Sequence, residues 1–358
     1  MTSQRVLIVG ASGRAAAASA IRAGFQPVVI DLFADDDTHR LAKSYRCHDY
    51  PAGFILLAKS LPRMPWFYTG GLENHPALVD VISEHHDLLG NPGGVLRQVR
   101  DPWYLQQLGN QFAPVEQPAS QAPTLPCVRK PLGGSGGSGI RFAEATDRCD
   151  EPGYYYQQFI SGESFSAIFQ ATADNVVSLG VTRQLIGTPW LHAKPFQYGG
   201  NISQPWELEP LGSWPATLAE RTGLRGIFGI DFCGEPSRVL EVNPRYPASL
   251  EVLELATRTS LLFRTTPPYQ TRCVVGKAVY YAPVDIRIPR TGPWSDEFLH
   301  TFDPWRVTDY ADIPHEDTLV SQGEPVLTLL AEADTGAEVL HILKGRAASL
   351  DDFFGYHK

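Results

Sequence analysis

The sequence is poor in the features that would mark several other classes of protein. Its five cysteines, Cys47, Cys127, Cys149, Cys233 and Cys273, are far apart and form no CxxC pair. An odd, scattered set favours reduced thiols over a disulfide framework or a zinc site. No apolar run approaches the roughly 20 residues of a membrane-spanning helix, and the first ten residues lack the apolar centre of an export signal. We therefore expect a cytoplasmic protein with no membrane partner.

Basic residues are also in deficit. Lysine and arginine total 30 against 39 aspartates and glutamates, a formal charge of −9. This balance argues against a nucleic-acid partner, although a local basic pocket for a nucleotide remains open. Hydrophobic residues make up 43% of the 358 positions, enough for a packed core, and the length suits two or three domains.

The first segment alternates short apolar strands with helices. Val6–Val9 and Pro27–Asp31 are predicted strands flanking an alanine-rich helix at 15–23, and Trp66–Thr69 is a third strand. This order predicts an open parallel α/β sheet. The Gly10–Arg14 turn with Asp31 imitates a dinucleotide fingerprint, but no complete G-x-G-x-x-G is present. A substrate-binding or structural role for this turn is favoured over NAD binding.

The remaining elements are predicted from local texture. Residues 113–126 hold four prolines and should be irregular, the acidic run 35–37 should be a solvated loop, and His85 and His86 should lie at an exposed helix end. The predicted strands are 127–130, 154–160, 164–171, 176–181, 226–233, 237–243, 277–283 and 326–331, and the predicted later helices are 76–88 and 332–347. The fold class is therefore mixed α/β (α+β).

Lys130 precedes the most glycine-dense loop of the chain. Backbone N–H groups in such a loop can wrap an anion without obstruction by a Cβ, and the lysine adds a fixed positive charge. The pattern favours nucleotide phosphates, with a flexible linker as the alternative. It is not a Walker loop, because no Gly-Lys-Ser/Thr follows. The phosphate-binding candidates are Lys130, Gly133, Gly134, Ser135, Gly136 and Gly137.

Residues 229–245 read as a β-hairpin that carries acidic side chains. Period-two alternation sends Glu241 and Asn243 to one face, and Asp231 on the partner strand can reach it. Two carboxylates and an amide oxygen suit Mg²⁺, which prefers one or two carboxylates together with substrate phosphates. Arg245 could brace a phosphate by a bidentate contact. The alternative is a solvated polar face, but neighbouring Leu240 and Val242 favour burial.

Taken together, these motifs resemble the ATP-grasp superfamily in order and spacing. Lys130 with its loop, the segment Tyr156–Glu163 and the Glu241-Val-Asn-Pro-Arg245 hairpin carry the resemblance, which covers roughly residues 1–265. It implies that Gln157, Gln158, Phe159 and Ile160 form the hinge that contacts adenine. It also implies that Glu163 holds the ribose, and that Asp231, Glu241 and Asn243 bind one or two Mg²⁺, with Mn²⁺ as an alternative.

The resemblance implies a three-part chain with an ATP-grasp fold. A Rossmann-like pre-ATP-grasp domain would occupy residues 1–95, the nucleotide-binding and catalytic domain 96–265, and a small β-rich C-terminal lobe 266–358. One departure concerns a second ATP-contacting lysine, which the family carries in an Asp-Lys context near the start of the grasp domain. Pro102 follows Asp101 here, so Arg100, Arg129 and Arg183 are the candidate replacements.

Substrate contacts are the least specific part of the pattern. Ser12 and Arg14 lie on the first turn of the α/β segment, and Glu73 and Asn74 follow its third strand, where ligands bind in open sheets. Tyr198 and Asn201 in a Tyr-Gly-Gly-Asn segment, with Arg183 nearby, could read a carboxylate. For each of these residues a plain structural role is the alternative.

The function that we predict is an ATP-dependent ligase. Val99–Pro102, Tyr198–Asn201 and the 312–326 segment resemble amino-acid ligases of the superfamily, including relatives of tyramine–glutamate ligase and of the ligase of pyrrolysine synthesis. On this resemblance, the carboxylate of an amino acid would attack ATP to give an acyl phosphate, which an amine converts to an amide. Lys130 and Arg245 are the catalytic candidates. A homodimer is common among such enzymes, and a catalytically degenerate ATP-binding or regulatory protein is the alternative.

Overall fold

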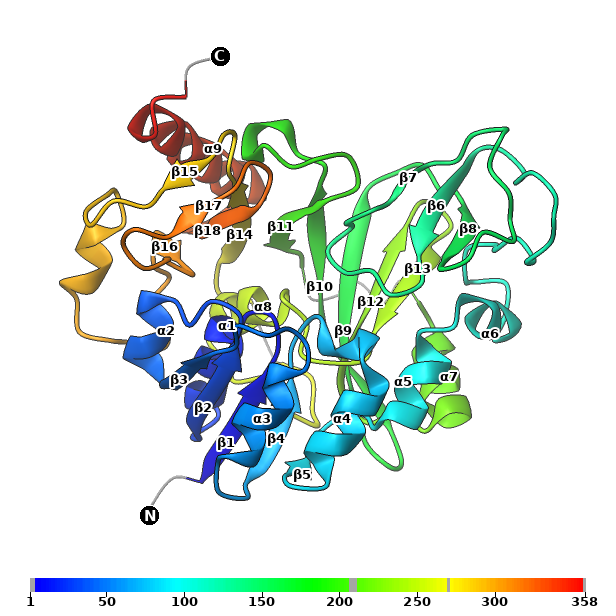
Figure 1. Ribbon diagram of the computed structural model, residues 1–358, viewed down its shortest axis with the longest axis horizontal. Coiled ribbons are helices and arrows are strands. Elements are labelled where there is room, and N and C mark those ends of the chain that lie inside the picture. Colours follow the sequence, from blue (N-terminus) through cyan, green and yellow to red (C-terminus); the bar gives the residue numbers. More distant parts are fainter. Residues whose placement is uncertain (1–3, 206–210, 269–270, 357–358) are drawn as a thin grey trace.

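The computed structural model describes residues 4–205, 211–268 and 271–356. Its N-terminal lobe is a five-stranded parallel sheet in the order β3-β2-β1-β4-β5, with helices on both faces (Figure 1). Its strands are β1 (Arg5–Val9), β2 (Gln26–Asp31), β3 (Lys43–Arg46), β4 (Pro65–Tyr68) and β5 (Asp87–Leu88). Its helices are α1 (Arg14–Arg22), α2 (Asp36–Leu41), α3 (Gly53–Lys59) and α4 (Pro76–Ser83), and α5 (Gly93–Val99) and α6 (Pro102–Gln107) lead onward.

Strands β1, β2 and β4 form where the sequence predicts them, because they are apolar and buried. The sequence analysis does not predict β3 and β5, whose residues are polar or partly exposed. The alanines of α1 let the helix lie close against β1 and β2, and Ala16, Ala17 and Ala20 are fully buried there. The predicted helix at 76–88 ends early at Ser83, since the chain then enters β5.

The middle of the chain supplies two antiparallel sheets. The smaller has the order β7-β6-β8, and the larger, of eight strands, has the order β13-β12-β9-β10-β11-β14-β18-β16. The strands are β6 (Cys127–Pro131), β7 (Arg141–Phe142), β8 (Tyr154–Gln158), β9 (Ser164–Ala171), β10 (Val176–Ile186), β11 (Tyr198–Ser203), β12 (Gly226–Cys233) and β13 (Arg238–Asn243). Helices α7 (Trp214–Thr222) and α8 (Leu250–Thr257) accompany them.

Three strands of the C-terminal segment extend the larger sheet, and β15 and β17 pair apart as a two-stranded sheet. Strand β14 pairs with β11, and β18 pairs with both β14 and β16. Its strands are β14 (Val274–Tyr281), β15 (Ile286–Arg287), β16 (Tyr310–Ala311), β17 (Leu319–Val320) and β18 (Pro325–Ala333), and α9 (Gly336–Phe353) ends the segment. A Thr335–Glu338 capping box starts α9, and its buried side chains, Val339 and Leu343 among them, join the core around Tyr280.

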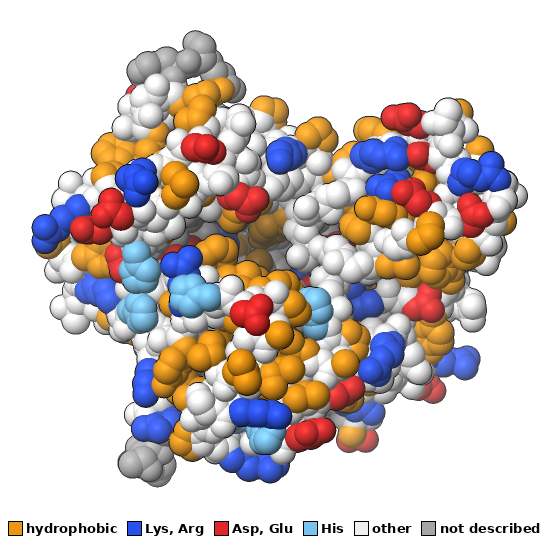
Figure 2. Space-filling view, viewed as in Figure 1, with side chains coloured by type: hydrophobic (Ala, Val, Ile, Leu, Met, Phe, Trp, Pro, Cys, Tyr) orange, Lys and Arg blue, Asp and Glu red, His pale blue; other side chains and the backbone are white. Residues whose placement is uncertain are grey.

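Three parts of the molecule meet at one hollow. The N-terminal lobe, the β6–β8 sheet and the C-terminal segment converge beside the larger sheet. The face drawn in Figure 2 is hollowed where they meet. Across the described ranges, no helix has the length and apolar content that crossing a bilayer would require.

Candidate functional site

A cavity of about 440 Å³ lies between the smaller and the larger antiparallel sheets. A cavity of this volume suits a small molecule. It gathers residues from four separate parts of the sequence, which are β6 with the glycine loop, the end of β8, strand β11, and the hairpin of β12 and β13. Its lining includes Lys130, Gly136, Gly137, Gln157, Gln158, Phe159, Ile160, Tyr198, Asn201, Asp231, Glu241, Asn243 and Arg245.

Lys130 lies near the end of β6, where alternation turns its side chain toward the cavity. Only 7% of the residue is exposed. Its Nζ donates to Gln157 Oε1 (3.2 Å) and to the carbonyl oxygen of Leu240 (3.3 Å). Burial would lower the pKa of Lys130, but Tyr155 and Glu241 more than offset this, so its pKa lies above the usual value. The cavity therefore holds a fixed cation.

The glycine loop between β6 and β7 folds over the cavity. Gly136 and Gly137 both have positive φ, at +61° and +77°. A Cβ on Gly137 would lie 1.9 Å from the carbonyl oxygen of Phe196, and the Tyr198 N–H donates to the Gly136 carbonyl at 2.9 Å. The loop is thus packed against the start of β11 and is not a free linker. Gly134 and Ser135 line a smaller neighbouring pocket, and Gly133 makes no such close approach.

The end of β8 forms one wall of the cavity. Gln157 is buried, and its side chain accepts from Lys130 and donates to the Ala113 carbonyl at 3.4 Å. Phe159 packs edge to face against Phe142 and Phe196. Glu163 lies outside the lining, with its side chain exposed and 3.3 Å from Arg183.

The hairpin of β12 and β13 brings the acidic residues together. Asp231 pairs directly with Glu241, and Gly229 with Asn243. Burial, and then Glu241, raise the pKa of Asp231 to about 6. Burial also opposes the ionisation of Glu241, but Arg100 and Lys130 hold its pKa below the usual value. The Asn243 amide donates to Asp231 Oδ2 at 3.0 Å.

This donor set fits a divalent cation. The charge of Glu241 raises the pKa of Asp231, so a cation between the two carboxylates would stabilise the ionised Asp231, and Asn243 Oδ1 offers a third oxygen. In the described part of the chain, no cluster of three His, Cys, Asp or Glu side chains that could hold a metal occurs. The hairpin therefore provides two carboxylates only, a number that suits Mg²⁺ or Mn²⁺ shared with phosphate oxygens.

Of the three arginines considered as replacements for the absent lysine, only Arg100 reaches this region. It forms an ion pair with Glu241, and its Nη2 donates to the Gly134 carbonyl at 2.9 Å. Arg129 instead pairs with Glu151, and Arg183 with Glu163. Asp101 caps α6 by accepting the N–H groups of Trp103 and Tyr104, and Pro102 is the first helical residue.

Arg245 lies just after the hairpin and faces two cavities. Its Nε donates to Glu73 Oε1 at 3.0 Å, and its Nη2 donates to Asn243 Oδ1 at 2.9 Å. The other carboxylate oxygen of Glu73, Oε2, is buried with no hydrogen-bond partner. The ion pair between Arg245 and Glu73 fixes the hairpin to the N-terminal lobe.

The second cavity, of about 450 Å³, lies at the carboxyl ends of β1, β2 and β4. Ligands bind at this edge in open α/β sheets. Its walls come from the N-terminal lobe and from the C-terminal segment. It shares Tyr198, Arg245 and Ala248 with the first cavity, so the two cavities adjoin.

The predicted substrate residues divide into two groups. Ser12 and Tyr198 line the second cavity, and Asn201 lines the first. Asn74 donates to the Gly134 carbonyl (3.3 Å) and accepts from Arg100 (3.2 Å). Arg14, Glu73, Asn74 and Arg183 do not line the second cavity.

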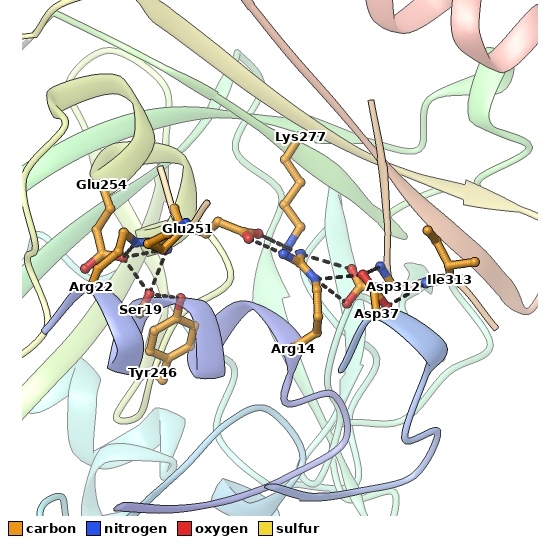
Figure 3. A network of polar contacts seen from close by, with 11 residues as sticks. Arg14, Ser19, Arg22, Asp37, Tyr246, Glu251, Glu254, Lys277, Asp312 and Ile313 are labelled. Carbon is orange, nitrogen blue, oxygen red and sulfur yellow. Dashed lines mark hydrogen bonds and ion pairs between the residues drawn. The ribbon is translucent and has the colours of Figure 1, made fainter. Parts of the chain in front are cut away.

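Arg14 instead belongs to a buried network between the lobes, drawn in Figure 3. Its Nη2 donates to Glu251 Oε2 (2.9 Å) and its Nε to Asp312 Oδ1 (3.0 Å). Lys277 Nζ also donates to Glu251, at 3.0 Å. Asp31 has a structural role too, because it accepts the N–H groups of Gly13 (2.8 Å) and Ala34 (2.6 Å).

Two predictions about exposure are wrong. Asp35 is only 6% exposed and lines the second cavity, so the acidic run 35–37 is not a solvated loop. His86 is fully buried and contacts the Ala58 carbonyl oxygen at 2.9 Å, although His85 is exposed as expected. Sequence reasoning also missed Lys277 and Asp312 as partners of Arg14, because no local pattern links residues so distant in the chain.

Comparison with known proteins agrees with this architecture. Residues 104–249 match the family model described as ATP-grasp domain. A search of curated proteins found no match.

Several solved structures are similar over nearly the whole chain. An L-amino acid ligase from Bacillus licheniformis has a TM-score of 0.67 at 12% identity, covering 98% of each chain. A carboxyaminoimidazole ribonucleotide synthase from Aspergillus clavatus, complexed with ATP, has 0.67 at 12%, covering 98% of this chain and 99% of its own. A biotin carboxylase from Campylobacter jejuni has 0.66 at 13%, covering 97% and 91%. At such identities the likeness concerns the fold, which is the one that the sequence predicts.

Proposed function

We propose that the chain is an ATP-dependent carbon–nitrogen ligase, on the premise that residues 104–249 match the ATP-grasp domain model. The observation that carries the proposal is the single cavity in which Lys130, the glycine loop and the Asp231–Glu241 pair converge. A cation, loop amides and paired carboxylates are what a nucleoside triphosphate and its metal require. Similar solved structures described as an L-amino acid ligase and a carboxylase support this class.

The residues are proposed to act by positioning and electrostatics. Lys130 and the N–H groups of the glycine loop hold the phosphates, and Gln157–Ile160 lie against the adenine. Glu163 would hold the ribose only after its side chain turned from Arg183 into the cavity. Asp231, Glu241 and Asn243 hold Mg²⁺, which would neutralise the charge developing on the transferred phosphoryl group. Arg100 supplies the second cation in place of the absent lysine, since it lies beside both the loop and Glu241.

The reaction is proposed to proceed through an acyl phosphate. A carboxylate in the second cavity attacks the γ-phosphorus of ATP, and the bond from that phosphorus to the bridging oxygen breaks to release ADP. An amine then attacks the acyl carbon, loses a proton and expels phosphate to leave an amide. Arg245 faces both cavities, which suits a residue that steadies the carboxylate beside the phosphate.

We propose that the chain has three parts, a Rossmann-like domain at 1–95, the nucleotide-binding and catalytic domain at 96–265, and a C-terminal part at 266–358. Strands of the last two share the eight-stranded sheet, so this division separates functions more than folding units. Cytoplasmic location and a homodimeric state stay predictions.

A substrate screen tests the proposal. ADP and phosphate release would be measured with MgATP and pairs of amino acids and amines, followed by mass spectrometry of the products. We expect release that requires both a carboxylate and an amine, with an amide as product. In Lys130→Ala the KM for ATP should rise about 10- to 100-fold, since a hydrogen bond to a charged group is worth roughly 1.5–3 kcal/mol. Metal-independent ATP binding without ADP release would instead favour a degenerate or regulatory protein.

A further inference from the structure

Asp35 is a buried carboxylate without a partner. The residue precedes α2, lines the second cavity and is 6% exposed. Its side chain does not cap α2, and among the described residues nothing hydrogen-bonds or ion-pairs with its carboxylate. Neighbouring Asp31 and Asp37 do have partners, since both accept backbone N–H groups. An unpaired buried carboxylate is costly, so its retention at a cavity wall points to a ligand.

The cations nearby are already engaged. Arg14 pairs with Glu251 and Asp312, and Lys277 pairs with Glu251 (Figure 3). Burial, together with Asp37 and Asp312, raises the pKa of Asp35 well above its usual value. Arg46 also lines this cavity, but its Nε donates to the Leu32 carbonyl at 3.2 Å. Within the described residues, no cation of the protein is therefore paired with Asp35.

The rest of the cavity lining limits what could bring a positive charge to Asp35. Phe33, Val320 and Leu327 add apolar surface to the same cavity, and Arg245 lines it where it adjoins the first cavity. A ligand that fills this space would carry a cation at one end, an apolar body, and an anion at the other end.

We propose that Asp35 binds an ammonium group of the acid substrate. This inference rests on the proposed ligase function, and it names the substrate class as an amino acid with an apolar body. Its ammonium lies at Asp35, and its reacting carboxylate lies at the Arg245 end. Because a protonated amine held by a carboxylate is not a nucleophile, this amino acid is the acyl donor, and the amine that it joins enters separately.

Matched ligand pairs test the proposal by binding. Calorimetry in the presence of MgADP would compare 4-aminobutanoate with butanoate, 6-aminohexanoate with hexanoate, and 8-aminooctanoate with octanoate, acids that differ only by the terminal amine. For at least one pair we expect the protein to bind the ammonium-bearing member at least about tenfold more tightly. Asp35→Asn should reduce this preference to less than about threefold. Asp174→Asn, in the exposed turn between β9 and β10, should leave it unchanged.

The unliganded variant gives a second readout. Asp35→Asn removes an unpaired buried charge, so its melting temperature should equal or exceed that of the unaltered protein. Equal binding within every pair, a preference that survives in Asp35→Asn, or a lower melting temperature of that variant would each overturn the proposal. ADP release with hydroxylamine as the amine separates the two claims. Preferential binding without ADP release leaves the ammonium site standing and removes the ligase function.

Discussion

The guanidinium of Arg100 forms an ion pair with the carboxylate of Glu241, although 141 positions separate the two residues in the chain. Arg100 lies between α5 and α6, and Glu241 lies on β13 opposite Asp231 of β12. Arg100 also donates to the Gly134 carbonyl of the glycine loop. One cation thus joins the loop to the acidic hairpin, at the edge of the cavity proposed for ATP.

Arg100→Ala should therefore weaken ATP use more than the loss of another arginine nearby. It removes a buried cation next to Glu241, and we expect a rise of about tenfold or more in the KM for ATP. Arg129→Ala is the matched control, because Arg129 pairs with Glu151 instead of with Glu241 and the glycine loop. Steady-state kinetics of ADP release would compare them. Similar KM values for the two variants would show that Arg100 does not replace the absent lysine.

Gly137 should tolerate no side chain. At φ +77° and with a Cβ position 1.9 Å from the Phe196 carbonyl oxygen, Gly137→Ala must displace the loop from β11. We expect kcat/KM for ATP to fall about tenfold or more. Gly133→Ala provides the comparison within the same loop, since open space surrounds its Cβ position. If both variants turn over alike, the loop acts only as a linker.

The metal site proposed on the hairpin of β12 and β13 is tested by changes of charge at nearly constant side-chain size. Glu241→Gln removes one of the two carboxylates and should abolish turnover while the melting temperature stays within a few degrees. Asn243→Asp would place a third negative charge against Asp231, to which the Asn243 amide now donates. Metal affinity should then change, with partial activity at altered Mg²⁺ concentration.

Titration of activity against Mg²⁺ and Mn²⁺ would reveal either effect. A folded Glu241→Gln protein with unaltered rate and metal dependence would remove the hairpin from the site. Surface substitutions usually stay within about ±0.5 kcal/mol of the original stability, so such a result would identify a merely polar surface.

The contact between α2 and the C-terminal segment should depend on pH. The Asp37 carboxylate accepts the N–H groups of Asp312 (2.8 Å) and Ile313 (3.1 Å), and burial raises the pKa of Asp37 above its usual value in spite of Arg14. The Asp37 carboxylate thus binds a proton more tightly in the folded state than in the unfolded chain. The resulting stability is fully present below about pH 4 and is lost as the pH rises through the raised pKa.

Thermal unfolding at pH 5 to 8 would measure this. Over that range the unaltered protein should lose more stability than Asp37→Asn, by on the order of 2 °C in melting temperature. Asp174→Asn should follow the unaltered protein, because this side chain is exposed and distant. Parallel profiles for all three proteins would contradict the expectation.

Much of the fold could be predicted from the sequence, because its signals are local. The strands at 164–171 and 226–233 occur with the predicted bounds, and the β1-α1-β2 unit follows its apolar runs closely. The pairing of Asp231 with Glu241 follows from alternation in a hairpin with a short turn. The hairpin, the loop and the end of β8 could be assigned to one site before their positions were known, because their order and spacing resemble those of the ATP-grasp superfamily.

The parts that could not be predicted depend on contacts between distant segments. The run 35–37 reads as a solvated loop because three acids in sequence normally face water, but the C-terminal segment covers it and leaves Asp35 at a cavity wall. Arg14 looks like a ligand-binding residue at the end of a strand. Its partners Glu251 and Asp312 come from elements more than 230 positions away, so no local pattern indicates them.

The buried ion pairs on α1 also limit how such a chain can change during evolution. Arg14 and Arg22 on α1 neutralise Glu251 and Glu254 on α8. If recombination exchanged the N-terminal lobe for that of a relative without both arginines, Glu254 would lose its arginine partner and Glu251 would keep only Lys277, so two buried carboxylates would be undercompensated, at a cost of several kcal/mol. The lobe and α8 must therefore be inherited together, and a functional chimera would need its junction after α8 instead of at the end of the first sheet.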